Sequence, residues 1–308
     1  MNNKTLDAIS FGSCYVDTNA SEYPFAATGI PVETELVGGA YQVVPGGSAV
    51  NFCMLLQALG LNTSFVGMIG DDPNGEVLEE LLQEQGVKPA LVRRPELLTN
   101  ISFGMTNPDG EHIMLVAGTA NAALSPEVVL PQLEATLPSV ALLFMGGCFK
   151  LKAFWPAYKD IAAMARKDNT HIVVDHNRIP AGTVAATLQI VRELVLEATY
   201  YLPSRQEFCQ LWEVETIEEG VRLLYEKAPE LTVVVKDGGN GAYYGQKGVA
   251  QHVPGLKVQK VLNLTGAGDF FNAGVMRAIV QERPLSEAVS YGCQVAAAKI
   301  QGKEAPRL

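Results

Sequence analysis

The chain has 308 residues, of which 48% are hydrophobic and 18% are charged, so it can bury a large core and is not expected to be mainly disordered. Its formal net charge is −10 and no run of Lys or Arg occurs in it, which argues against nucleic-acid or anionic-membrane partners. The five cysteines include no C-x-x-C pair, and neither a signal core nor an 18-residue apolar stretch is present, so we expect a cytoplasmic protein with reduced thiols.

Short apolar or β-branched runs alternate with longer segments of helical length along most of the chain. The residue pattern predicts strands at 8–12, 63–69, 141–145, 171–175, 199–202 and 231–236. It predicts helices at 49–59, 75–85, 156–167, 184–197, 217–227 and 269–281. This alternation is typical of a mostly parallel sheet with helices on both faces, and no clear linker divides the chain into domains.

Two regions break the alternation. Residues from about 20 to 45 are rich in Gly, Pro and β-forming residues, and residues from about 100 to 118 alternate around the turn sequence Asn107-Pro108-Asp109-Gly110. We expect both regions to form strands outside the main sheet. From the residues alone they are either a small β lid or two ordinary edge hairpins.

Asp17 follows the first predicted strand closely, after the Gly12-Ser13 turn. Ligands of open α/β sheets bind at the carboxyl ends of parallel strands, so Asp17 is well placed to accept hydrogen bonds from sugar hydroxyls. Position alone is also compatible with a solvated loop acid.

A Gly46-Gly47 turn opens a predicted helix that is apolar nearly all round and therefore buried. Asn51 is the one amide in its first two turns and needs hydrogen-bond partners there. These partners are either backbone groups or the hydroxyls of a polyol substrate, which the two glycines would allow to approach the main chain.

The Gly67–Gly75 stretch is interpreted as a strand end, a loop and a helix start.

Two further segments each have a structural and a functional interpretation. Ser204 and Glu207 match the capping-box pattern of a helix start, and Glu207 is also suited to a hydrated magnesium ion. Residues 231–244 predict a hairpin with a glycine turn, and the same loop, with Lys236 beside it, is suited to wrapping nucleotide phosphates. The four histidines lie in no ligand spacing, and none is assigned a catalytic role.

Glycine is dense at Gly266-Ala267-Gly268-Asp269, where a strand-like stretch, 257–262, runs into an apolar helix. The first amides of a helix have no internal partners, so this turn is suited to binding a phosphate. A carboxylate there would repel the phosphate unless it deprotonates a hydroxyl nucleophile, as Asp does in other phosphoryl-transfer enzymes. The structural alternative is an Asp269 that only complements the helix dipole.

The Gly46-Gly47-x-x-x-Asn51 cluster, the Gly-x-x-Gly-x-Asp loop at 67–72 and the Gly266–Asp269 turn together resemble the ribokinase-like, or PfkB, family of carbohydrate kinases over essentially the whole chain. The resemblance implies one doubly wound α/β domain spanning 1–308, with a β lid formed by about 18–45 and 98–120. It also implies transfer of the ATP γ-phosphate, with Mg²⁺, to a sugar hydroxyl expected to be primary. Dimerisation through the lid is common in the family, so a homodimer is expected.

The resemblance also implies roles for individual residues. Asp269 matches the catalytic base, and the amides of Gly266, Ala267 and Gly268 match the anion hole. The following residues match substrate-binding positions: Asp17, Gly46, Gly47, Asn51 and, as an anion contact, Arg178. The following match cofactor-binding positions: Ser204, Glu207, Lys236, Gly238, Gly241 and Cys293. Of these, Glu207 would act on magnesium through water.

The chain departs from the family pattern at several of these positions. Asn263 stands where Asp is usual and Lys303 where Ala is usual, which argues against a potassium site. Ser204 replaces the Asn of an Asn-x-x-Glu motif, and Cys293 falls near the position where ribokinases often place a polar side chain that contacts adenine. Gly146-Gly147 falls about where ribokinases carry a ribose-binding Glu, which argues against ribose itself.

We therefore expect a cytoplasmic sugar kinase, and two alternatives remain. A nucleoside kinase on the same fold would stack a base on aromatic side chains, namely Tyr23, Phe25, Tyr41 or Phe103. A non-catalytic sugar- or nucleotide-binding relative is supported only by the departures at Ser204, Asn263 and Cys293. An oxidoreductase that binds a dinucleotide is disfavoured, because no G-x-G-x-x-G follows the first strand.

Overall fold

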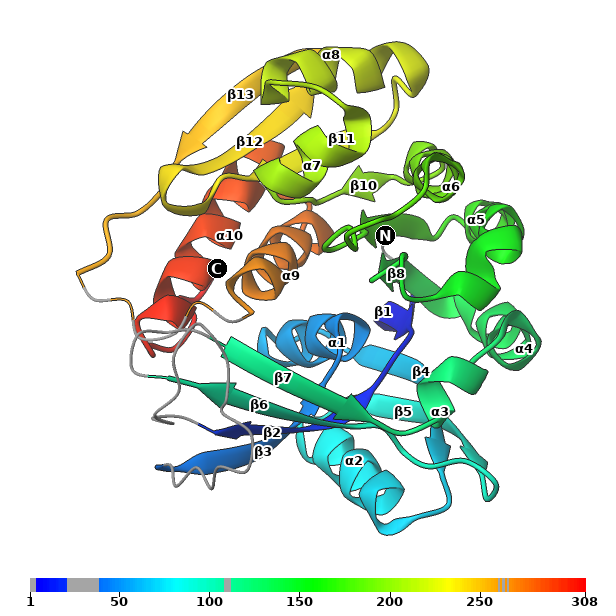
Figure 1. Ribbon diagram of the computed structural model, residues 1–308. Helices are drawn as coiled ribbons and strands as arrows, with labels where there is room; N and C mark the ends of the chain where they lie inside the picture. The colour runs from blue at the N-terminus through cyan, green and yellow to red at the C-terminus, as the bar shows by residue number, and fades with distance from the viewer. Residues whose placement is uncertain (1–3, 21–38, 108–111, 260, 262–263, 265) are drawn as a thin grey trace.

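The computed structural model describes residues 4–20, 39–107, 112–259, 261, 264 and 266–308. In this part of the chain a nine-stranded sheet has the order β13-β12-β11-β10-β9-β8-β1-β4-β5 (Figure 1). The strands from β11 to β5 pair in parallel, and β12 and β13 add an antiparallel hairpin at one edge. The strands are β1 (Leu6–Phe11), β4 (Thr63–Gly70), β5 (Lys88–Arg94), β8 (Val140–Gly146), β9 (His171–Asp175), β10 (Tyr200–Tyr201), β11 (Thr232–Lys236), β12 (Gly241–Gln246) and β13 (Val249–Pro254).

Helices cover both faces of this sheet, as a doubly wound fold requires (Figure 1). One face carries α1 (Ser48–Ala58), α2 (Pro73–Glu84), α9 (Ala267–Val280) and α10 (Leu285–Ile300). The other carries α4 (Pro126–Thr136), α5 (Tyr158–Lys167), α6 (Ala185–Leu196), α7 (Arg205–Trp212) and α8 (Ile217–Lys227). The shorter helices are α3 (Ala120–Ala123), η1 (Leu137–Ser139), η2 (Lys152–Ala157) and η3 (Gly238–Asn240). None of the described helices is long and apolar enough to cross a membrane.

A second, four-stranded sheet lies apart from the main one, beside α1 and α2 (Figure 1). It consists of β3 (Tyr41–Gly46), β2 (Tyr15–Ala20), β6 (Ile101–Thr106) and β7 (His112–Ala117), in that order. Val16 anchors it through a core shared with α1 and α2. The expectation of strands outside the main sheet is confirmed. Part of the predicted lid, 21–38, and the turn residues 108–110 lie outside the described residues.

The twelve strands and helices predicted for the main alternation are all present, with boundaries that differ by at most two residues. The strand-like stretch expected before Gly266 is not a strand at its described residues, 257–259 and 261. The helix at 217–227 and the strand at 171–175 match the prediction, whereas the helix at 156–167 begins as the 3-10 segment η2. The final helix α10 was not among the predicted elements. It packs along α9 and therefore helps to fix the turn at 266–269.

Candidate active site

Two cavities meet at the first turn of α9. A cleft of about 800 Å³ lies between the small sheet and the main domain, and Gly266 and Asp269 line it. A second, more apolar cavity of about 380 Å³ includes Ala267 and Gly268 in its wall. One helical turn therefore borders both cavities.

The candidate base, Asp269, faces the larger cleft and accepts a hydrogen bond from Asn51 Nδ2 at 3.0 Å. Burial raises the pKa of Asp269 to about 6, and the Asn51 bond partly offsets this effect. A carboxylate with such a pKa is suited to accepting a proton near neutral pH. The partner of Asn51 is thus a carboxylate, which neither sequence interpretation of this amide named.

The backbone at the start of α9 takes the shape that its glycines allow. Gly266 has a left-handed conformation (φ 76°) and forms the N-cap of the helix. The Ala267 N–H donates to the Leu264 carbonyl at 3.1 Å, so in this structure it does not point to an open anion site. Of the predicted anion-hole amides, those of Gly266 and Gly268 remain candidates for binding a phosphate, together with the amide of Asp269.

Asp17 lies in β2 of the small sheet, and not in a loop after the first strand as its sequence position indicated. Its carboxylate accepts a hydrogen bond from Ser102 Oγ at 2.6 Å, and it lines the cleft. Burial raises the pKa of Asp17, while Ser102 and the charge of Lys150 act in the opposite direction. The small sheet, and not the main sheet, therefore delivers this carboxylate to the cleft.

The Gly46-Gly47 turn has a packing reason of its own. A Cβ on Gly46 would stand 1.8 Å from Asp17 Oδ2, and a Cβ on Gly47 would stand 2.2 Å from the Ser13 carbonyl oxygen. Gly47 is also left-handed, with φ 109°. Gly46 therefore makes room for the Asp17 carboxylate of the neighbouring strand β2, and Gly47 lets the chain pass close to the backbone of Ser13. Substrate binding by their backbone stays a prediction.

Behind the α9 turn, the carboxyl ends of β9 and β11 contribute a buried charge pair. Lys236 Nζ donates to Asp175 Oδ2 at 2.7 Å and to Asn272 Oδ1 at 3.1 Å, and Asn272 Nδ2 donates to Asp175 Oδ2 at 2.6 Å. Burial would raise the pKa of Asp175, but the charge and hydrogen bond of Lys236 lower it below the usual value. Sequence analysis assigned Lys236 and missed Asp175 and Asn272. The position of Asp175 at the end of a predicted parallel strand was the available signal.

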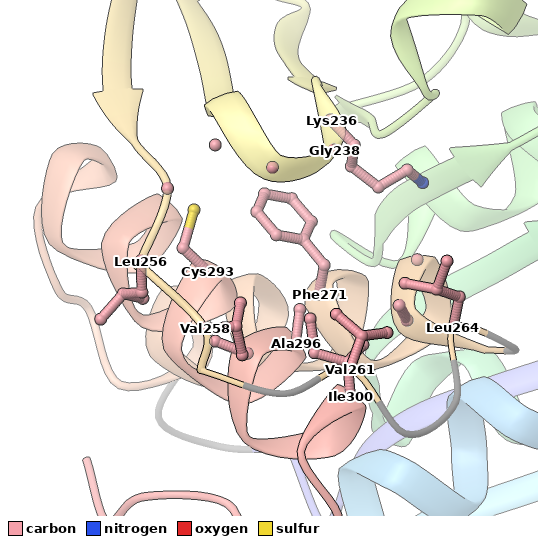
Figure 2. Close-up of a pocket in the computed structure, with 16 residues that line it drawn as sticks. Lys236, Gly238, Leu256, Val258, Val261, Leu264, Phe271, Cys293, Ala296 and Ile300 are labelled. Atoms are coloured by element: carbon pink, nitrogen blue, oxygen red, sulfur yellow. The ribbon is translucent and has the colours of Figure 1, made fainter.

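The predicted hairpin at 231–244 is confirmed by the antiparallel pairing of β11 and β12. Its glycine turn borders the smaller cavity, which is also lined by Phe271, Cys293, Ala296 and Ile300 (Figure 2). Cys293 is 8% exposed, and burial raises the pKa of its thiol to about 11. This cavity is therefore an apolar pocket beside a polar turn, a combination suited to a nucleobase and its phosphates.

Ser204 and Glu207 form the capping box that their spacing predicts. Ser204 N and Oγ donate to Glu207 Oε2 at 2.8 and 2.6 Å. Both bonds end on Oε2, so they do not engage Oε1. Among the described residues no cluster of three His, Cys, Asp or Glu could hold a metal ion. A magnesium ion would therefore depend on substrate phosphates and water, the arrangement this ion favours.

The remaining predicted site residues are Arg178, the residue pair Gly146-Gly147 and the candidate stacking aromatics. Arg178 is exposed in the segment after β9. Its neighbour Asn177 places Oδ1 3.7 Å from the Cβ position of Gly147, so this segment lies beside the site where ribokinases carry Glu. Tyr41 lines the cleft and is 71% exposed. Tyr23, Phe25 and Asn263 lie outside the described residues.

Comparisons with known proteins agree with this geometry. The model of the pfkB family of carbohydrate kinases matches residues 6–306. The ribokinase of Haemophilus influenzae is 27% identical and covers 89% of this chain and 87% of its own. The 5-dehydro-2-deoxygluconokinase of Halalkalibacterium halodurans is 26% identical over an alignment that covers 94% of this chain and 87% of that relative.

Solved structures share the fold over nearly the whole chain. A PfkB protein from Polaromonas sp. superposes with a TM-score of 0.82 at 25% identity, covering 97% of each chain. A putative ribokinase II from E. coli in complex with ATP and Mg²⁺ gives a TM-score of 0.81 at 21% identity, covering 96% of this chain and 92% of its own.

Proposed function

Since this chain belongs to the PfkB family of carbohydrate kinases, we propose that it transfers the γ-phosphate of MgATP to a hydroxyl group of a small carbohydrate, with Asp269 as the base. The main support for this proposal is the position of the turn at 266–269, which borders both the open cleft and the apolar pocket. A sugar in the cleft and a nucleotide in the pocket would meet at this turn. The raised pKa of Asp269 suits it to accept the hydroxyl proton.

In this mechanism the protein mainly positions groups and neutralises charge. Asp17 and Asn51 would bind sugar hydroxyls in the cleft, and Asn51 also orients the Asp269 carboxylate. The amides of Gly268 and Asp269 would bind the transferring phosphate. The nucleotide turn from Lys236 to Gly241 would hold the other phosphates, and Cys293 would contact the base. Magnesium, when bound, neutralises phosphate charge, and Glu207 would hold it through water.

The absence of side chains at Gly146-Gly147 supports an acceptor other than ribose. A Cβ on Gly146 would stand 2.5 Å from the Phe144 ring, and a Cβ on Gly147 would stand 3.4 Å from Ser48 Oγ and 3.7 Å from Asn177 Oδ1, so a ribose-binding Glu would meet close neighbours here. Arg178 follows in the same segment and would contact an anionic group. One of the relatives is named for a sugar acid. We therefore rank sugar acids with neutral ketoses and aldoses as acceptors.

A nucleoside kinase is a second candidate because of Tyr41. This ring is 71% exposed and lines a cleft of about 800 Å³, which has room for an acceptor larger than a monosaccharide. Phe103, the other described aromatic residue proposed for stacking, lies in β6 and does not line this cleft.

The test is acceptor-dependent release of ADP from MgATP, measured with a panel of ketoses, aldoses, sugar acids and nucleosides, with and without potassium. We expect ADP release with at least one sugar or sugar acid and little effect of potassium. Release with nucleosides alone would establish the second candidate. Release with none of them would favour a non-catalytic binding protein, and strong potassium activation would contradict the interpretation of Asn263 and Lys303.

A further inference from the structure

Three polar side chains from separate elements form a closed hydrogen-bonded set next to the first turn of α9. Asp175 ends β9, Lys236 ends β11, and Asn272 lies in the second turn of α9. The side chains of Lys236 and Asp175 are 13% and 3% exposed, and Asn272 is fully buried. Asn272 contacts both other members, accepting from Lys236 at 3.1 Å and donating to Asp175 at 2.6 Å.

This set fixes the Lys236 ammonium in place. An ammonium has three donors, and here they meet Asp175 Oδ2, Asn272 Oδ1 and the Leu202 carbonyl. Figure 2 shows the Lys236 side chain extending away from Cys293, which lines the opposite side of the apolar pocket. Its Nζ lies 3.8 Å from the position that a Cβ on Gly268 would occupy. An anion bound by the Gly268 amide would therefore lie beside a positive charge that cannot swing away.

Stability alone is a weak reason for such an arrangement. A buried ion pair gains little over well-packed apolar residues of similar volume, because both charges lose their hydration. By contrast, a charge held in place before the reaction stabilises charge that moves during it, without any cost of reorganisation at that moment. The set also lies at the carboxyl ends of parallel strands, where open α/β sheets bind their ligands.

We propose that Asp175 and Asn272 are positioning residues that fix the Lys236 ammonium at the start of α9, where it stabilises the negative charge of the phosphoryl group in transfer. The inference deepens the proposed function and rests on it. It assigns Lys236 to the transferring phosphate, in addition to the nucleotide turn. It also gives roles to two residues that the sequence did not single out.

The same set has a second, independent effect on the candidate base. Asp269 is faced by Asn51 from α1, by Asp175 from β9, by Lys236 from β11 and by Glu207 from α7. Asp175 and Glu207 raise the pKa of Asp269, and Lys236 and Asn51 lower it. Removing the charge of Asp175 should therefore move the acidic limb of the pH–rate profile to lower pH. Removing the charge of Lys236 should move it to higher pH.

The experiment compares Lys236→Met, Asp175→Asn, Asn272→Ala and the Lys236→Met/Asp175→Asn double variant with the wild type. We expect kcat to fall at least about 100-fold in Lys236→Met, as for loss of one preorganised group that stabilises the charge of the transition state. In Asp175→Asn and Asn272→Ala it should fall roughly 10- to 100-fold, because the ammonium remains but is displaced. The double variant should be no slower than Lys236→Met, since Asp175 acts through Lys236. KM for the acceptor should stay within about twofold of the wild-type value if the loss is confined to the transferring phosphate.

A structural role predicts different results. It predicts losses of kcat that add in the double variant, a lowered Tm and an unchanged acidic limb, and this outcome would overturn the proposal. If Asp175→Asn does not fold, the choice between a positioning role and a structural role rests on the other three proteins. These are Lys236→Met, Asn272→Ala and the double variant, of which the last leaves no unpaired buried charge. The matched control is Arg93→Met, which removes the cation that pairs with Glu79 on α2 and should leave kcat unchanged.

Calorimetric titration with ATP and with adenosine separates this inference from the proposed function, because it requires no turnover. Lys236→Met should weaken ATP binding by about tenfold or more and leave adenosine binding unchanged, since only ATP carries phosphates. Equal affinities of wild type and variant for ATP would overturn the role of Lys236, even in an active kinase. Absence of turnover with every acceptor would instead refute the proposed function.

Discussion

At the scale of single residues, Asp269 combines two conflicting demands on a carboxylate. It must be ionised to accept a proton, yet it stands in the first turn of a helix that is proposed to bind a phosphate. Partial burial disfavours the charged form and raises its pKa to about 6, whereas the 3.0 Å bond from Asn51 favours the charged form. The result is a carboxylate that is ionised at neutral pH and can still hold a proton during the reaction.

This balance predicts a pH dependence. As the pH falls through about 6, Asp269 takes up a proton, so kcat/KM should decline on the acidic side of that value. In Asn51→Ala the bond that lowers the pKa is lost, and the acidic limb should move to higher pH. Rates measured from pH 5 to 8 in a constant-ionic-strength buffer check this shift. An unshifted limb in Asn51→Ala would show that the limb does not report Asp269.

At the scale of elements, the site depends on how α1 and α9 are seated on the main sheet. Phe52, one residue after Asn51, is 1% exposed and stacks on Phe144 of β8 with ring centroids 4.0 Å apart. This contact holds the start of α1 against the sheet and thereby sets the direction of Asn51. The packing of α10 along α9 does the same for Asp269.

Loss of the Phe52 ring should therefore be costly. Phe52→Ala leaves a cavity under α1, and we expect the free energy of unfolding to fall by about 3–5 kcal/mol, measured by urea denaturation. Val77→Ala on α2 is the matched control, because Val77 is 37% exposed and its loss should cost no more than about 0.5 kcal/mol. Equal effects of the two changes would contradict the assigned core.

How far the sequence predicts this site depends on the kind of signal each residue carries. Gly266 to Asp269 and Asn51 stand in local patterns, and the structure brings Asn51 and Asp269 into contact although they are 218 residues apart. Asn272 lies in an apolar segment with no local pattern, and Asp175 is marked only by its position at the end of a predicted strand. Their roles become apparent only in the fold, where three elements converge on Lys236. Asp17 was placed in the wrong element because one residue pattern suits both a loop and a short strand of a separate sheet.

At the scale of the whole molecule, the small sheet delivers Asp17 to the cleft on one face and exposes apolar side chains on the other. The pairing register places Val43, Thr18, Phe103 and Leu115 in one row across the sheet, on the face opposite Asp17. Val43 and Leu115, at the two ends of the row, are 39% and 60% exposed. Exposed apolar side chains on one face of a sheet are typical of an interaction surface, so we propose that two copies of the chain associate through this face.

Leu115→Lys tests this association. A charge at the β7 end of the row, where the exposed Leu115 stands, should convert a dimer to a monomer, measured by sedimentation velocity at micromolar concentration. Val249→Lys is the control, because Val249 is 61% exposed on β13 at the far edge of the main sheet. A wild-type protein that is already monomeric under these conditions would refute the proposed dimer.

The most direct test of the account concerns Asp269 and uses the acceptor that the panel identifies. Asp269→Asn keeps the shape of the side chain and removes the base. The account predicts that kcat falls at least about 100-fold while ATP and the acceptor still bind with nearly wild-type affinity. Turnover retained at the wild-type rate in Asp269→Asn would contradict the assignment of the base and, with it, the central claim.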